Sequence, residues 1–259
     1  MDLFSLDPNV TLTFILALMR ISLVLFLMPF FGGSVLPATV KAALCLTLTL
    51  ALWPRLPLMG AQMPGHPFAL AVMLGAELLL GLILGMVVRF IFAAIQTGGQ
   101  LIGFQMGFAM VNVVDPDSGA SEAVTAHFLY MVSLLTFLAI NGHLYLLSGL
   151  MKSFDLLPPG AILITPRLAE QIFSLSGQIF VLAIQIGAPV IAAIILVDLA
   201  LALISRASPQ MNVLIVGFPL KIGVGFLFLG LIFEIISRYM ESFVSRLPLL
   251  FSQLISAMR

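Results

Sequence analysis

Long apolar runs, separated by short segments rich in proline, glycine or polar residues, dominate the pattern along this chain. A helix that crosses a membrane needs roughly 20 apolar residues, and four or five of the runs reach that length. No ten-residue segments alternate with a period of two, which argues against a β-barrel. The pattern predicts an all-α chain with apolar runs at about 10–31, 35–53, 68–95, 98–114, 124–147, 172–204 and 210–236.

Prolines and glycines predict where these helices end. Proline lacks the amide hydrogen that continues a helix, and glycine favours turns. The run at 172–204 is overlong and contains Pro189, whereas the runs at 35–53 and 98–114 are short. We therefore expect membrane-associated helical hairpins with broken helices, joined by segments at 28–37, 53–67, 156–166 and 206–212.

Charges near the two ends of the chain bear on its orientation in a membrane. The N-terminal part carries Asp2 and Asp7, and the C-terminal part carries three arginines against Glu241 alone. Because basic residues accumulate on the cytoplasmic side, this predicts the N-terminus outside and the C-terminus inside, with an odd number of crossings. The runs do not give a clean odd number, so we do not expect a simple serpentine.

Composition indicates that lipid or other subunits cover the chain. Hydrophobic residues make up 61% of it and charged residues only 8%, whereas a soluble domain is about 25% charged. The formal net charge is zero, which gives no sign of nucleic-acid binding. The single cysteine, Cys45, has no partner for an internal disulfide and is expected to be a packed thiol.

Seven charged residues nevertheless lie within or beside the apolar runs. A charge at the centre of a bilayer costs roughly 2.5–3.5 kcal/mol, so most of them must form pairs, reach the interface, or face a polar cavity or a subunit. Glu234 and Arg238 are four residues apart and can pair on one helix. The seven residues are Arg20, Lys41, Glu77, Arg89, Asp198, Lys221 and Glu234.

Glycines recur at helical spacing in two of the runs, which lets another backbone approach a helix closely. Gly81 and Gly85 show this spacing, and so does the set Gly99, Gly103 and Gly107. Two further stripes accompany the second set, Phe104 with Phe108 and Met106 with Met110. Such stripes fit either plain core packing or a constriction in a pore, and the spacing does not decide between them.

No arrangement in the sequence predicts an enzyme. The three histidines are scattered without metal-ligand spacing, and there is no glycine-rich phosphate loop. Asp115, Ser118 and His127 lie close in sequence, but no GxSxG elbow accompanies them, and DPDSG is typical of a turn. Two alternatives stay open: a secondary transporter with broken transmembrane helices, and an intramembrane enzyme that uses Asp198, for which no second aspartate in a partner motif is evident.

Three segments together resemble one known family. They are GFQMGFAMVNVVDPDSGASEA at 103–123, NGH at 141–143, and SPQMNVLIVGFPLKIGVGFLFL at 208–229. In these motifs, and in length and hydropathy over nearly the whole chain, the sequence resembles the FliR family. These are export-gate proteins of flagella, with homologues in injectisomes, and the DPDSGASEA loop favours the flagellar branch.

The resemblance implies a core subunit of the flagellar type III protein export gate, without enzymatic activity or a cofactor. Family members act as one copy with about five FliP and about four FliQ subunits, and FlhB joins outside. Unfolded export substrates pass through their shared channel. The implied fold stacks helical hairpins with these partners into a helical cone in the bacterial inner membrane, raised largely toward the periplasm. Within this single export-gate domain, about 1–150 would resemble FliP and about 151–259 FliQ.

The resemblance also implies a loop that plugs the channel, at about 106–122. We expect apolar plug contacts first and then a polar tip, from Met106, Phe108, Met110, Val113, Asp115, Pro116, Asp117 and Ser118. Polar contacts with other subunits are expected at Lys221, Asp198, Glu77 and Arg89.

Overall fold

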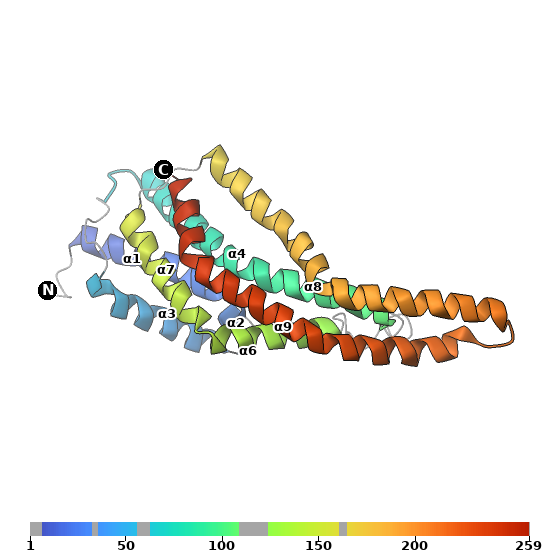
Figure 1. Cartoon of the computed structure of the whole chain (residues 1–259). Coiled ribbons are helices and arrows are strands. Elements are labelled where there is room, and N and C mark those ends of the chain that lie inside the picture. Colours follow the sequence, from blue (N-terminus) through green and yellow to red (C-terminus); the bar gives the residue numbers. More distant parts are fainter. Residues whose placement is uncertain (1–6, 33–35, 56–62, 109–123, 161–164, 259) are drawn as a thin grey trace. The chain divides into compact units, whose positions relative to one another are not determined.

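All regular structure is helical in the residues that the computed structural model describes, which are 7–32, 36–55, 63–108, 124–160 and 165–258 (Figure 1). The all-α prediction is thus confirmed for these residues. The elements are α1 (Pro8–Leu27), α2 (Pro29–Gly32), α3 (Ala38–Leu52), the short 3-10 helix η1 (Trp53–Arg55), α4 (Pro67–Met106), α6 (Val124–Ala139), α7 (Gly142–Leu156), α8 (Pro166–Ala207) and α9 (Val213–Ser256).

Within the described ranges, four helices are long and apolar enough to cross a membrane, namely α1, α4, α8 and α9. The number becomes five if α6 and α7 count together as one interrupted span. This confirms the prediction of four or five spans. The turn predicted between the last two long runs is also present, because α8 ends at Ala207 and α9 begins at Val213.

The positions of three helix breaks differ from those predicted. Gly98 and Gly99 lie inside α4, so the runs at 68–95 and 98–114 contribute to one helix, and α8 continues through Pro189. The run at 124–147 divides instead at Asn141, whose φ of 58° is left-handed. Composition misplaced these breaks because tertiary packing, more than local propensity, holds a long helix together.

The described chain packs as two compact units. Unit 1 comprises Met1–Phe90, Asn141–Leu175 and Phe243–Arg259, and unit 2 comprises Ile91–Ile140 and Ser176–Ser242. Helices α4, α8 and α9 each contribute one part to each unit. The division of the chain into a FliP-like and a FliQ-like part concerns likeness to other proteins, and it stays a prediction.

Unit 1 has its core along α1. Asp7 caps this helix by accepting a hydrogen bond from the Asn9 amide at 3.0 Å. The first part of α4 approaches α1 closely, since a Cβ on Gly85 would lie 2.6 Å from the Cβ of Leu27. Cys45 is buried on α3, as expected. The fully buried apolar residues of this unit include Leu16, Ile21, Val24, Leu80, Leu84, Leu146, Leu150 and Phe154.

Unit 2 combines the second part of α4 with α6 and long parts of α8 and α9. The rings of Phe92 and Phe137 pack edge to face with centroids 5.6 Å apart, and those of Phe128 and Phe233 with centroids 5.8 Å apart. These pairs join α4 to α6 and α6 to α9.

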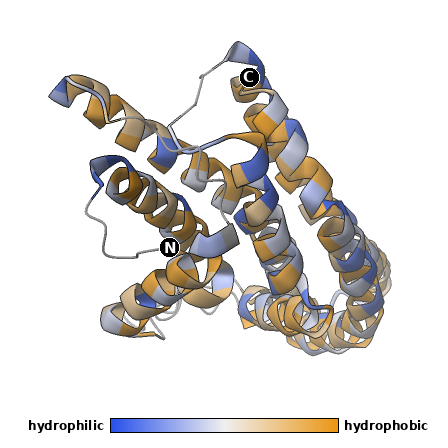
Figure 2. Ribbon diagram, turned by 90° about the vertical axis from the view of Figure 1, so that its left-hand side faces the viewer, coloured by the Kyte–Doolittle hydropathy of each residue, from blue (hydrophilic) through white to orange (hydrophobic). Residues whose placement is uncertain are grey.

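Large apolar surfaces remain uncovered on the two longest helices. The most apolar windows of α8 and α9 are only 28% and 22% buried, whereas that of α4 is 61% buried. Figure 2 shows hydrophobic residues around most of the helices and not on one stripe alone. Exposed apolar surface of this extent marks contact with lipid or with other proteins.

Candidate functional site

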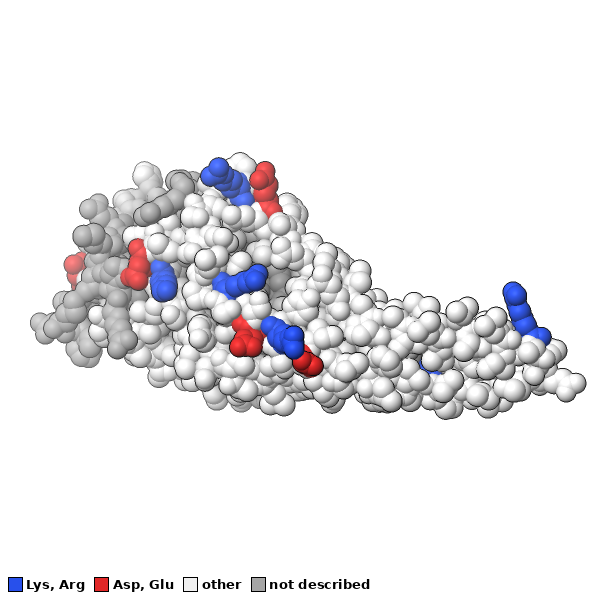
Figure 3. Space-filling model, viewed as in Figure 1, with Lys and Arg blue, Asp and Glu red and all other residues white. Residues whose placement is uncertain are grey.

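Charged side chains are few on the face shown in Figure 3, where they occur singly or in small groups on a largely uncharged surface. Three ion pairs of the described residues involve charges from the apolar runs, namely Arg20 with Glu77, Asp198 with Lys221, and Glu234 with Arg238. Lys41 is half-buried on α3, and Arg89 is exposed on α4. The ion pairs differ widely in burial. A buried pair holds helices of the chain together, whereas an exposed pair is accessible to other molecules.

In unit 1, Arg20 and Glu77 form an ion pair that solvent does not reach, with both side chains 0% exposed. Arg20 Nε and Nη2 donate to the two carboxylate oxygens of Glu77 at 2.7 and 2.8 Å. Arg20 Nη1 donates to the backbone oxygens of Ser153 and Leu157 at 3.3 and 3.1 Å, and the Gly160 amide donates to Glu77 Oε1 at 2.9 Å. The pair therefore ties α1 and α4 to the end of α7 and the turn after it.

The surroundings of this pair offset the cost of burying two charges, because both side chains are hydrogen-bonded. The guanidinium also lies 4.3 Å from the centre of the Phe154 ring, a favourable cation–π distance. Arg20 and Glu77 are 57 positions apart, so local spacing in the sequence does not predict their pairing. The Glu77 carboxylate is engaged within the chain, whereas a contact with another subunit is expected from the sequence.

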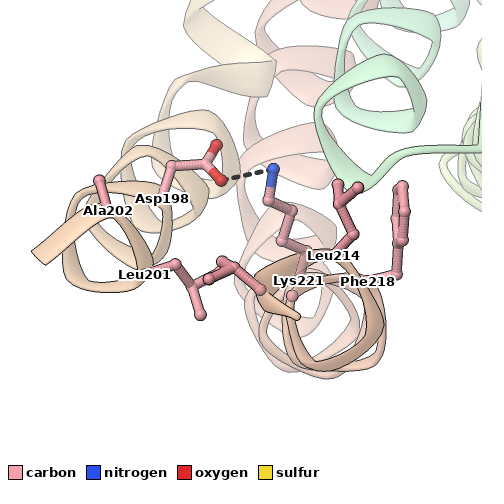
Figure 4. Close-up of a pocket in the computed structure, with 8 residues that line it drawn as sticks. Asp198, Leu201, Ala202, Leu214, Phe218 and Lys221 are labelled. Carbon is pink, nitrogen blue, oxygen red and sulfur yellow. Dashed lines mark ion pairs between the residues drawn. The ribbon is translucent and has the colours of Figure 1, made fainter. Parts of the chain in front are cut away.

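In unit 2, Asp198 on α8 and Lys221 on α9 form a second ion pair (Figure 4). Their side chains are 44% and 22% exposed, so this pair is accessible from outside the unit. It borders an open pocket of about 230 Å³. The remaining lining is apolar and includes Leu201, Ala202, Leu214 and Phe218.

The third ion pair lies on a single helix. Arg238 Nη2 and Glu234 Oε1 are 2.6 Å apart on α9, with both side chains more than half exposed. Their spacing of four residues indicated this pair in the sequence, and the structure confirms it.

Glycines bring backbones into contact around α4 in unit 2. A Cβ on Gly99 would lie 2.6 Å from the Cα of Ala126 on α6, closer than real side chains come. Thr125 Oγ1 donates to the Gly99 carbonyl at 2.8 Å beside this contact. On α8, the carbonyl oxygen of Ala183 would lie 2.9 Å from a Cβ on Gly98. Any larger residue at either glycine would force the helices apart.

Helix α4 ends at Met106 through a glycine turn. Gly107 has a φ of 89°, its amide donates to the Phe104 carbonyl at 3.1 Å, and the Phe108 amide donates to the Gly103 carbonyl at 3.0 Å. This is the Schellman arrangement that terminates many helices. Gly107 is therefore the cap of α4 and not the third member of a helix face, and Phe108 lies beyond the helix.

Other predicted plug residues lie outside the described residues, namely Met110, Val113, Asp115, Pro116, Asp117 and Ser118.

Among the described residues, no group of three or more histidines, cysteines, aspartates or glutamates could hold a metal ion. The histidines lie apart: His66 and His127 are exposed, and His143 is half-buried at the start of α7.

Comparison with known proteins places the chain in a family. The family of bacterial export proteins, family 1, matches residues 11–247. The chain is 31% identical over 239 residues to the flagellar biosynthetic protein FliR of Escherichia coli (strain K12), covering 92% of this chain and 91% of that protein. It is 35% identical over 222 residues to the FliR protein of Bacillus subtilis (strain 168), covering 83% and 84%.

Apolar helices and the family match define a membrane component of bacterial protein export. The chain belongs to the FliR family of bacterial export proteins, which confirms the resemblance found in the sequence. The family and these relatives support a component of the flagellar export apparatus, and the four apolar helices support an inner-membrane protein.

Proposed function

We propose that this chain is a non-enzymatic core subunit of the flagellar type III export gate and forms, with FliP and FliQ, the channel for unfolded export substrates. The observation that carries the proposal is the family match over residues 11–247, which includes the central segment and both helices that flank it. Energy for export would come from other components, because no nucleotide-binding motif is present in the sequence.

The central segment, at about 106–122, is the proposed plug of this channel. Two helices that contact each other through their backbones at Gly99 and Ala126 carry it, since α4 ends at its first residue, Met106, and α6 begins just after it. Such a base would fix the two end points of a functional loop. We assign apolar plug contacts to Phe108, Met110 and Val113, and the tip to Asp115, Pro116, Asp117 and Ser118.

Partner subunits are the proposed cover for the apolar surfaces of α8 and α9. Phe173 is 76% exposed and Leu227 is 72% exposed, which is unfavourable in water. We propose that FliP and FliQ cover such residues, with FlhB outside, and that this assembly is raised toward the periplasm. The accessible charges at Asp198, Lys221 and Arg89 are the proposed polar contacts in it, whereas Glu77 acts within the chain.

Deletion of residues 110–119 tests the plug. Cells that carry the variant gate should leak ions or small solutes across the inner membrane, because the channel would lack its closure. Replacement of 56–62 by glycine and serine, in a connector predicted from sequence, is the control and should not leak. An intact gate complex with no added leak after the deletion would contradict the plug role.

Co-purification tests membership in the gate. The chain should be unstable when produced alone and stable when produced with FliP and FliQ, since partners would cover its apolar helices. A chain that is stable and folded alone in detergent, without affinity for either partner, would favour a transporter that works as a single subunit.

A further inference from the structure

Phe218 makes a contact that the proposed function leaves unexplained. It lies on α9, within the motif at 208–229, and is half-buried. A Cβ on Gly107 would lie 2.7 Å from Phe218 Cε1 and 2.8 Å from its Cδ1. The ring therefore covers the turn that ends α4, where only glycine combines the left-handed φ with the space available.

Gly225 on α9 receives the residue before this turn. A Cβ on Gly225 would lie 2.7 Å from both Sδ and Cε of Met106, so the absence of a side chain makes room for the methionine. Met106 is fully buried. Phe218 and Gly225 are seven residues apart and therefore lie on one face of α9. This face contacts Gly107 through Phe218 and Met106 through Gly225, and so holds the end of α4.

The Phe218 ring lies apart from the charged side chain of Lys221, although both are on α9 (Figure 4). Figure 4 shows Lys221 directed toward Asp198 on α8, with Phe218 on the side of α9 away from Asp198. Helix α9 thus contacts α8 through an ion pair and α4 through an aromatic ring.

We propose that Phe218 and Gly225 form a seat for the end of α4 and so fix the point from which the chain continues beyond Phe108. Phe218 is a positioning residue for the plug in this account, which rests on the proposed function. Loss of the ring removes this contact from a one-turn cap, and helix ends with few contacts open readily. The end of α4 would then vary in position while the rest of unit 2 remained packed.

Cysteine labelling in the purified gate complex measures the seat directly. Cys45 is replaced by serine, and a single cysteine is introduced as Phe108→Cys, just beyond the cap. Addition of Phe218→Ala should raise the rate of reaction with a maleimide at position 108 several-fold, because the cap opens more often. Phe104→Cys is the matched control: Phe104 is 63% exposed on the last turn of α4, so its rate should not change.

In the labelling of Phe218→Ala, the seat is overturned by an unchanged rate at position 108, by an equal rise at position 104, or by the same effect from Phe226→Ala on an exposed part of α9. If Phe218→Ala prevents assembly of the complex, Phe218→Leu replaces it, because leucine keeps an apolar contact but not the full ring. It should give a smaller rise at position 108, and no rise would contradict the proposal.

Leak measurements separate this inference from the proposed function. Phe218→Ala should increase solute leak several-fold, although less than deletion of 110–119. If the deletion leaks and Phe218→Ala does not, Phe218 does not position the plug and the inference is wrong, while the plug stands. If the deletion does not leak but labelling at position 108 still rises, the seat stands as a structural contact and the plug is wrong.

Discussion

The two units of this protein handle charge in opposite ways. In unit 1, Arg20 and Glu77 are fully buried, bidentate and tied to three backbone groups. In unit 2, Asp198 and Lys221 are partly exposed beside an open apolar pocket. A buried ion pair favours one arrangement of the helices, because any arrangement that separates the two partners leaves an unpaired charge in an apolar interior. An accessible pair carries little stability and can exchange partners on assembly.

The units also differ in how their helices are held. Helices meet closely at glycines in both units, at Gly85 against Leu27 in unit 1 and at Gly99 against the Ala126 backbone in unit 2, and unit 1 adds the buried Arg20–Glu77 pair. Added side-chain volume disrupts a backbone contact at glycine, whereas removal of a charge does not. In the Arg20–Glu77 network, removal of one charge is the disruptive change.

Glu77→Gln should destabilise the protein most, by about 3–5 kcal/mol, because it leaves Arg20 buried without a counter-charge. The variant should accumulate poorly in membranes, and the thermal midpoint of any purified complex should fall. The control is the double variant Arg20→Met with Glu77→Leu, which removes both charges at similar volume and should cost less than Glu77→Gln alone. A double variant as unstable as the single one would show that the backbone hydrogen bonds matter more than the charges.

Gly99→Ala should cost about 1–3 kcal/mol, because its Cβ would overlap the Ala126 backbone and force α4 from α6. The measurement is the thermal midpoint of the purified complex. Gly223→Ala on α9 is the matched control, since nothing lies within 4 Å of its added Cβ. The control should be neutral or slightly stabilising, as alanine favours helix, and equal effects at the two glycines would contradict close packing.

Lys221→Met should change the stability of the chain by no more than about 1 kcal/mol, because the pair with Asp198 is partly exposed. Its effect should appear instead in the fraction of chain recovered with FliP and FliQ, if the pair contacts another subunit. Asp198→Asn tests the same contact from the other side. A loss of stability as large as that of Glu77→Gln would abolish the contrast between the two units.

Glu234→Gln should have the smallest effect, about 0.3–0.5 kcal/mol, since Glu234 and Arg238 form an exposed pair on one helix. The thermal midpoint of the variant should match that of the native protein at high salt, where such pairs are screened. A difference that persists at high salt would indicate that a partner or lipid covers this part of α9.

Local features of the sequence were sufficient for several parts of the fold. Apolar runs of about 20 residues predicted helices of membrane-spanning length, and the turn at 208–212 follows from SPQMN in a chain otherwise rich in helix formers. The spacing of Glu234 and Arg238 gave their ion pair, because residues four apart face each other on a helix. In each case the interacting residues are neighbours in the chain.

The features of the candidate site depend on residues far apart in the chain. Gly107 looked like one more residue of a glycine-spaced helix face, and only its φ of 89° shows that α4 ends there. The cover over that turn comes from Phe218, more than a hundred positions later. The pattern of residues within α4 therefore could not predict this contact.

Hydrophobic burial and helix periodicity act over short stretches of chain, so the order of residues alone was sufficient to predict an all-α membrane protein with charges that need partners. Which partners those charges take, and where α4 ends, depends on packing between distant segments. Arg20 finds Glu77 and the backbone after α7 because three segments pack around one site from which water is excluded, and an ion pair there is stable only when every polar group is satisfied.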